Sequence, residues 1–191
     1  MAISAIRPVT PEAWDDLAEL FGPSGAYSGC WCMWWRVTGR QFSQNGNAGN
    51  RAALQALVSG GCEPGLLAYD ERRPAGWCAV SPRDQLGRVL RSPTLKPAEA
   101  DPGEGVWSVS CFYIPRDRRG QGLATALLDA AVAFARSRGA TAIEGYPLDP
   151  RGQRRPSAEL YTGTPSMFAR AGFSEVARRS QARAVMRREL R

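Results

Sequence analysis

Short apolar runs, separated by turn residues, recur along the chain in the pattern expected of strands. The runs at 65–69 and 75–80 flank a short polar segment, which predicts an antiparallel hairpin. The run at 106–114 is a particularly clear strand candidate, because β-branched and aromatic residues dominate it. The full set of predicted strands is 3–9, 65–69, 75–80, 106–114, 141–146, 173–179 and 182–188.

Helical spacing of apolar residues predicts helices between these strands. Thr10 and Pro11 form a typical helix start, with Thr10 as the expected cap. The segment 122–138 carries the strongest apolar stripe and ends at Gly139. The polar stretch 41–50 is expected as a loop or a helix approach, and 92–105 as a surface loop. The predicted helices are 11–21, 51–58, 84–91 (short), 122–138 and 165–171.

The order of these elements predicts an α/β (α+β) fold with a mixed sheet covered by helices. A long helix connects the strands at 106–114 and 141–146, so these two strands are expected to be parallel. The chain has 191 residues and shows neither an internal repeat nor a composition break. We therefore expect one domain over 1–191.

The amino-acid composition excludes several classes of catalytic and metal site. The chain contains no histidine, which excludes Ser-His-Asp and Cys-His catalysis and histidine-rich zinc sites. Cys30 and Cys32 form the one close cysteine pair, so no metal site is expected. The net charge of +7 favours an acidic partner, but the bias is almost entirely arginine and is poor evidence for nucleic-acid binding. Apolar runs are too short to cross a membrane, and the N-terminus lacks a secretory pattern, so a cytoplasmic protein is expected.

The turn after the strand at 106–114 predicts an anion site. It is basic, contains two glycines and opens the long helix. Glycines there allow successive N–H groups to point into one concavity, and the helix dipole adds positive potential. Neither a Walker loop nor a dinucleotide fingerprint fits, because no Gly-Lys-Ser/Thr follows and Thr125 stands where a third glycine is needed. The expected ligand is a phosphate or pyrophosphate.

The run Arg119-Gly120-Gln121-Gly122-Leu123-Ala124 resembles the acetyl-CoA signature Gln/Arg-x-x-Gly-x-Gly/Ala of the GNAT superfamily of N-acetyltransferases. The order of elements agrees over nearly the whole chain, and 161–173 is similar to the late helix of that superfamily with its Gly-Phe ending. The resemblance implies a GNAT-like mixed sheet, partly splayed, with helices on both faces. It also implies acetyl-CoA as the acyl donor substrate and no metal.

The resemblance places the cofactor in a gap between the strands at 106–114 and 141–146, with a bulge in the first of them. It implies that the acyl arm pairs with main-chain groups of the first strand, and that an N–H near Phe112 stabilises the oxyanion. The implied cofactor-binding residues are Phe112, Tyr113, Ile114, Arg119, Gly120, Gln121, Gly122, Leu123, Ala124 and Thr125.

Acetyl transfer needs a neutral amine and a proton for the departing thiolate. GNAT enzymes commonly use a tyrosine in the pattern Tyr-x-x-x-Gly-Phe, but Phe168 stands there. Tyr161 is the nearest replacement as the acid, with Ser166 or water as alternatives. Glu144, isolated inside an apolar strand, is the first candidate for the base, and an ion pair with an arginine is its alternative role. Glu104 is the second candidate base, and Cys111 suggests a less favoured acyl-enzyme route.

The acceptor in GNAT folds is shaped by the first two helices and their connection, which here hold Trp31, Trp34 and Trp35. Two roles are expected for these rings, a core plug and an apolar wall that contacts an amine through cation–π interaction, and different rings can take different roles. A small-molecule amine is the favoured acceptor. A protein acceptor and a non-catalytic acyl-CoA-binding module are the alternatives. We expect a monomer or homodimer, and acidic residues near the entrance if the acceptor is cationic, with Asp15, Asp16 and Glu19 as candidates.

Overall fold

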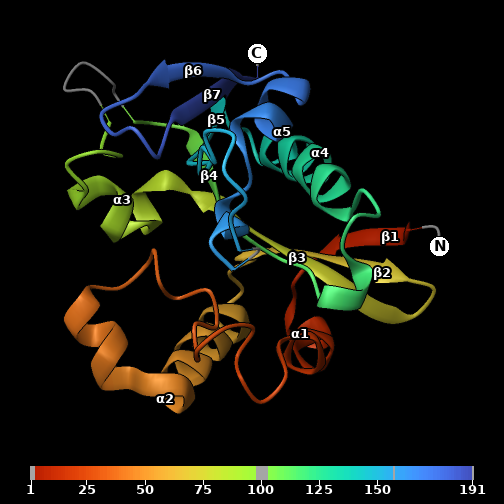
Figure 1. Cartoon of the computed structure of the whole chain (residues 1–191). Coiled ribbons are helices and arrows are strands. Elements are labelled where there is room, and N and C mark those ends of the chain that lie inside the picture. Colours follow the sequence, from red (N-terminus) through yellow and green to blue (C-terminus); the bar gives the residue numbers. More distant parts are fainter. Residues whose placement is uncertain (1–2, 98–102, 157, 191) are drawn as a thin grey trace.

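A computed structural model describes residues 3–97, 103–156 and 158–190. Within these residues, seven strands form one sheet in the order β1-β2-β3-β4-β5-β7-β6, and the β4–β5 pair is the one parallel pair (Figure 1). The mixed sheet and the parallel pair confirm the prediction. The strands are β1 (Ile3–Pro8), β2 (Gly65–Asp70), β3 (Arg73–Pro82), β4 (Val106–Tyr113), β5 (Ala142–Gly145), β6 (Ser174–Ala177) and β7 (Val185–Glu189).

Helices cover both faces of the sheet, as predicted (Figure 1). Alternate residues of one strand serve the two layers: Leu66 packs with α4, and Leu67 packs with α1 and α2 on the other face. Cys78 and Trp77 divide in the same way on the neighbouring strand. The helices are α1 (Trp14–Phe21), α2 (Gly39–Ser59), α3 (Gly87–Arg91), α4 (Leu123–Ser137) and α5 (Pro165–Arg170).

The sheet opens between β4 and β5. Their pairing begins at Val106 with Ala142 and ends at Val109 with Gly145, whereas β4 continues to Tyr113 alongside β3. The register of β4 against β3 shifts between Val109 and Cys111, so Ser110 forms a β-bulge. The expected bulge and splay are therefore both present. Beyond Val109, the edge of β4 that faces β5 pairs with no described strand.

Helix α2 differs from the prediction, because the polar stretch 41–50 belongs to it. The helix starts with a capping box, in which the Thr38 side chain accepts a bond from the backbone of Gln41 and the Gln41 side chain bonds back. Gly46, with φ 58°, kinks the helix without ending it. The buried Asn50 donates to the carbonyl of Gly29 at 2.9 Å, so the polar residues hold the preceding loop.

We predict that Thr38→Ala lowers the free energy of unfolding by about 1 kcal/mol, because the backbone N–H of Gln41 loses its side-chain acceptor. Urea denaturation measures the loss. Thr10→Ala is the control, because Thr10 precedes the 3-10 turn Pro11–Ala13 and, contrary to expectation, makes no side-chain capping bond. Equal losses in the two variants would show that the box at Thr38 contributes nothing.

Among the described helices, none is long and apolar enough to cross a membrane.

Candidate active site

The turn between β4 and α4 leaves a row of backbone donors free. A 3-10 turn, Arg116–Arg118, follows the strand, and Gly120 and Gly122 then adopt φ 74° and 81°. The first backbone bond into α4 runs from the N–H of Ala126 to the carbonyl of Gly122. Within the described residues, the six N–H groups of residues 120–125 have no hydrogen-bond acceptor. Six adjacent free donors at a helix N-terminus form a site for a phosphate.

Three arginines surround this turn, and they differ in the ion pairs and hydrogen bonds that they make. Arg118 is ion-paired with Asp70 at the end of β2, and its Nε atom lies 3.7 Å from Oδ2 of Asp117. Arg116 and Arg119 are exposed, and neither makes an ion pair with a described carboxylate. Arg119 donates from Nε to the carbonyl of Ile114 at 2.9 Å, which leaves its terminal nitrogens available. Two guanidinium groups are therefore free to meet an anion.

A largely apolar cavity of about 690 Å³ lies beside the open edge of β4. Its walls come from β4, from the loop between α1 and α2, from α2 itself and from the segment that leads into α5. The described lining residues are Ala26, Tyr27, Ser28, Cys30, Cys32, Trp34, Phe42, Cys111, Phe112, Tyr113, Ile114, Arg116, Arg119, Ala124, Ala158, Leu160, Tyr161, Gly163, Thr164 and Met167. The cavity thus joins the free arginines of the turn to the aromatic loop.

The predicted cofactor residues divide into two groups in this geometry. Phe112, Tyr113, Ile114, Arg119 and Ala124 line the cavity. The others form the turn outside it and offer backbone N–H groups. Leu123 is buried in the core beneath α4 and so presents its N–H rather than its side chain. The Gln121 side chain donates back to the carbonyl of Asp117, which braces the turn. The turn residues outside the cavity are Gly120, Gln121, Gly122, Leu123 and Thr125.

Tyr161 is half-buried in the cavity wall, beside the end of β4 that no longer pairs with β5. Its ring is 6.4 Å from that of Trp35, and the Arg183 guanidinium is 5.9 Å from both ring centroids. Arg183 also donates to the carbonyl of Tyr146 and to Thr162 Oγ1, each at 2.9 Å, so it fixes the segment that carries Tyr161. Burial raises the pKa of Tyr161 to about 12, although Arg183 opposes the rise. The phenol is therefore a protonated donor at neutral pH.

Three thiols face the same cavity. Cys32 Sγ lies 3.6 Å from Cys111 Sγ and accepts a hydrogen bond from the Trp77 indole at 2.8 Å. Burial raises the pKa of the Cys32 thiol well above its usual range. The hydrogen bond that the Cys30 thiol donates to Cys32 is the main cause that raises the pKa of Cys30, followed by burial. The Cys30 and Cys32 thiols are therefore protonated at neutral pH and are poor nucleophiles. Cys111, which lines the cavity among them, has no described base beside it.

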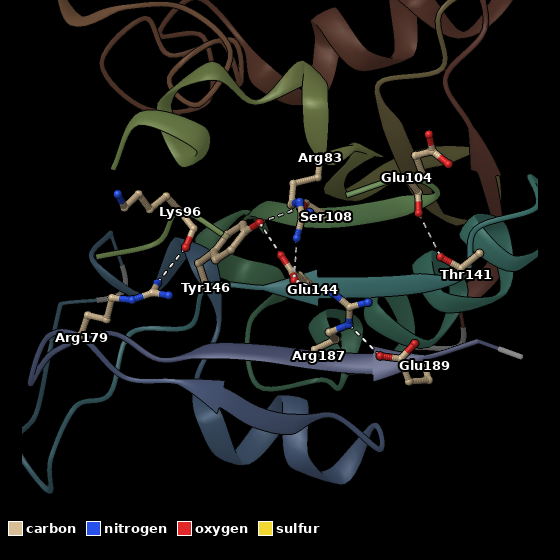
Figure 2. Close-up of polar contacts among 10 residues, drawn as sticks. All are labelled: Arg83, Lys96, Glu104, Ser108, Thr141, Glu144, Tyr146, Arg179, Arg187 and Glu189. Atoms are coloured by element: carbon tan, nitrogen blue, oxygen red, sulfur yellow. Dashed lines mark hydrogen bonds and ion pairs between the residues drawn. The ribbon is translucent and has the colours of Figure 1, made fainter. Parts of the chain in front are cut away.

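Glu144 lies away from the cavity, in a buried network on β5 (Figure 2). It is 4% exposed, and Oε1 accepts from Arg83 at 2.9 Å and from Arg187 at 3.3 Å. Tyr146 donates to Oε2 at 3.2 Å and lies 2.8 Å from Ser108 Oγ. Glu144 also stands opposite Ser108, where β4 and β5 are still paired. This arrangement favours the ion-pair role over the role of general base.

We expect Glu144→Gln to lower the free energy of unfolding by about 2 kcal/mol and to leave the turnover rate unchanged, because the buried Arg83 guanidinium loses the charge of the Glu144 carboxylate. Urea denaturation and kcat are measured together. Glu189→Gln is the control, since Glu189 is also paired with Arg187 but its side chain is 65% exposed. A large loss of kcat with unchanged stability would restore Glu144 as the base.

The other catalytic candidates lie outside the cavity. Glu104 is exposed and precedes β4 at the end opposite the cavity, where its carbonyl accepts from Thr141 (Figure 2). Ser166 is exposed, and its hydroxyl contacts Thr164. Phe168, at the position of the usual tyrosine, is fully buried against Phe112 and Phe173. It therefore serves the core.

The three tryptophans take different positions. Trp34 lines the cavity, 36% exposed, with Phe42 packed edge-on against it at 5.1 Å. Trp31 and Trp35 are buried and do not line the cavity: Trp31 stacks on Trp14, and Trp35 packs behind Tyr161. The prediction of an aromatic wall is thus limited by the structure to Trp34, and the core-plug alternative applies to the other two rings.

Several lining residues escaped the sequence analysis. Phe42 was hidden in a polar stretch, and its apolar character there was the one available signal. Tyr27, Leu160 and Met167 carried no pattern of their own. Among the described residues, no group of three or more His, Cys, Asp or Glu side chains is arranged to hold a metal ion.

The profile of the acetyltransferase (GNAT) family matches residues 31–161, which is more than half of the chain. The chain therefore belongs to the GNAT acetyltransferase family. No curated protein sequence matches it significantly.

Solved structures agree with the fold over nearly the whole chain. The yncA protein of Salmonella typhimurium, solved with its cofactor acetyl-CoA, is 14% identical, with coverage of 100% and 95% of the two chains and a TM-score of 0.57. The PaiA N-acetyltransferase of Thermoplasma acidophilum, in complex with coenzyme A, is 13% identical, with 99% coverage of both chains and a TM-score of 0.54. A ribosomal-protein-alanine N-acetyltransferase of Brucella melitensis is 18% identical, with 97% and 99% coverage and a TM-score of 0.53. At these identities the likeness concerns the fold.

Proposed function

We propose that this protein transfers the acetyl group of acetyl-CoA to the amine of a small molecule, by direct attack within a ternary complex. The observation that carries the proposal is the continuity of three features. The six free N–H groups of residues 120–125 lead to the open edge of β4, and that edge borders the cavity. A diphosphate at the turn would thus place an extended thioester arm along β4, with its acyl end in the cavity.

The chain's own groups supply the steps of transfer. Free main-chain groups on the open edge of β4 bind the arm, and an N–H near Phe112 stabilises the oxyanion that forms when the amine attacks. Tyr161 then gives its proton to the departing thiolate. The apolar lining of the cavity strengthens each of these polar interactions, because less water competes for them.

A small-molecule acceptor is supported by the walls of the cavity, which is partly open to solvent at Tyr27 and Ser28. The loop between α1 and α2 and the segment 158–164 both contribute walls, whereas a protein acceptor needs an open groove beside β4. A protein amine and a non-catalytic acyl-CoA-binding module are the alternatives. The five cysteines are all free, which suits a reducing compartment, and we propose the cytoplasm.

A CoA-release assay with mass spectrometry of the products tests the proposal. The full chain is incubated with acetyl-CoA and a panel of small amines and lysine or N-terminal peptides. Acetylated small amines are the expected products. Acetylated peptides alone would shift the function to protein acetylation, and acetyl-CoA binding with no product across the panel would favour a binding module.

A further inference from the structure

The charges around the cavity disfavour a cationic acceptor. Among the described residues that line it, the charged ones are Arg116 and Arg119, and none is a carboxylate. The acidic residues expected near the entrance do not line the cavity, and Asp15 among them is exposed on α1. Asp16 accepts a bond from Tyr69 at 2.8 Å, and Glu19 lines a separate hollow together with Arg51. A buried ammonium ion without a carboxylate partner is costly.

Trp34, which forms the aromatic wall of the cavity, already contacts a cationic side chain. The Arg88 guanidinium lies 3.7 Å from the centroid of the Trp34 ring. Its Nε and Nη2 atoms are buried and have no hydrogen-bond partner among the described residues, so contact with the indole face stabilises this charge. Phe42 packs its ring at 89° to the same indole. A second cation at Trp34 would meet a like charge across the ring.

The described lining of the cavity also holds no carboxylate or imidazole that could deprotonate an ammonium ion. The chain has no histidine, and Glu144 lies in its buried ion-pair network. A lysine-like amine with a pKa of about 10.4 is neutral in fewer than roughly one molecule in a thousand at pH 7. An arylamine needs no base, because its pKa lies well below neutrality and it arrives uncharged.

We propose that the acceptor is a weakly basic aromatic amine, uncharged at working pH, whose ring lies against Trp34 in the apolar cavity. The inference rests on the proposed acetyltransferase function. The amine nitrogen forms a bond to the thioester carbonyl carbon, and the carbon–sulfur bond breaks. The sulfur accepts the proton of Tyr161, and Tyr161 recovers a proton from the acylated nitrogen. The products are an N-aryl acetamide and free CoA.

Matched pairs of amines test this inference. Aniline is compared with benzylamine, and 4-phenylaniline with 4-phenylbenzylamine, because each pair shares its ring and differs in basicity. The full chain with acetyl-CoA is assayed at pH 7 for kcat/KM. We expect each arylamine to exceed its partner at least tenfold. Faster reaction of the benzylamines would overturn the inference and leave the acetyltransferase function intact. Failure of all four amines would overturn it too, and calorimetry with acetyl-CoA then shows whether the donor still binds.

A charge placed in the wall gives a second test. Ser28 is exposed, lines the cavity and has φ 50°, a conformation that Asp and Asn tolerate. Ser28→Asp should raise the benzylamine-to-aniline ratio of kcat/KM several-fold, and Ser28→Asn, which has the same size without the charge, should leave the ratio unchanged. An unchanged ratio in Ser28→Asp would show that the missing carboxylate does not set the preference.

Discussion

Gly122→Val should weaken CoA binding at least a hundredfold while the protein stays folded. Gly122 begins α4 with φ 81° and ψ 0°, a left-handed conformation that a β-branched residue adopts at a cost of about 1–2 kcal/mol. No atom lies within 4 Å of the site where a Cβ would be placed. The protein itself therefore accommodates the side chain, and the cofactor does not, because the added methyl groups stand among the free N–H groups of residues 120–125.

The same helix offers a matched control for this variant. Gly139 follows α4 at its other end with φ 78°, and the space around its missing Cβ is also open. Gly139→Val thus carries the same backbone strain about 25 Å from Gly122, given the rise of a helix per residue. Thermal denaturation should show similar losses in the two variants. Calorimetry with CoA should show a loss in Gly122→Val alone, and equal affinities would remove the turn as the diphosphate site.

The backbone geometry of the turn between β4 and α4 was predictable, because the residues that indicate it are adjacent in the sequence. A strand, two glycines and a helical stripe follow one another between residues 106 and 137, and the backbone geometry that they require is the geometry found. The splay of β4 from β5 was also predicted, through the resemblance, and the register confirms it. The start of α2 was missed because apolar periodicity gave no signal, whereas Thr38 and Gln41 held the capping information.

The acceptor side could not be predicted in the same way, because it depends on contacts between distant residues. Which of the three tryptophans faces the cavity depends on the left-handed conformations of Trp31 and Cys32, with φ 41° and 51°. No periodic pattern reports such backbone angles. Asn47 and Asn50 hold that loop from α2, and they appeared in the sequence only as part of a polar stretch.

The partners of Glu144 show the same limit. Arg83 and Arg187 come from elements far away in the sequence, and the folded sheet brings both of them to one carboxylate. An isolated glutamate in an apolar strand indicates that a partner or a function exists, without indicating which. A chain with many arginines offers too many candidate partners for the sequence to select one.

Tyr161→Phe should lower kcat about a hundredfold and change CoA affinity by less than twofold, because the ring remains and the proton donor is lost. The raised pKa of Tyr161, about 12, keeps its proton in place up to pH 10 and beyond. We therefore expect no fall in wild-type kcat from ionisation of this phenol between pH 7 and 10. Stopped-flow or steady-state CoA release measures kcat, and calorimetry measures the affinity.

A phenol with this pKa is a weak acid, and its match to the leaving group depends on the cavity. The same burial raises the pKa of the Cys32 thiol, so a CoA thiolate that departs into this space is also expected to be more basic than in water. Because the pKa of the thiol rises together with that of Tyr161, the proton transfer is less unfavourable than the raised pKa of Tyr161 alone suggests. The cavity thus makes Tyr161 a suitable donor for a thiolate formed inside it.

Tyr27→Phe provides the control for this prediction, because Tyr27 also lines the cavity but its side chain is 63% exposed. Its hydroxyl has water as an alternative partner, and its removal should leave kcat within twofold of the wild type. If Tyr161→Phe kept the wild-type kcat as well, water would be the proton source and Tyr161 would serve as a wall of the cavity. A hundredfold loss at Tyr27 instead would move the acid to the loop between α1 and α2.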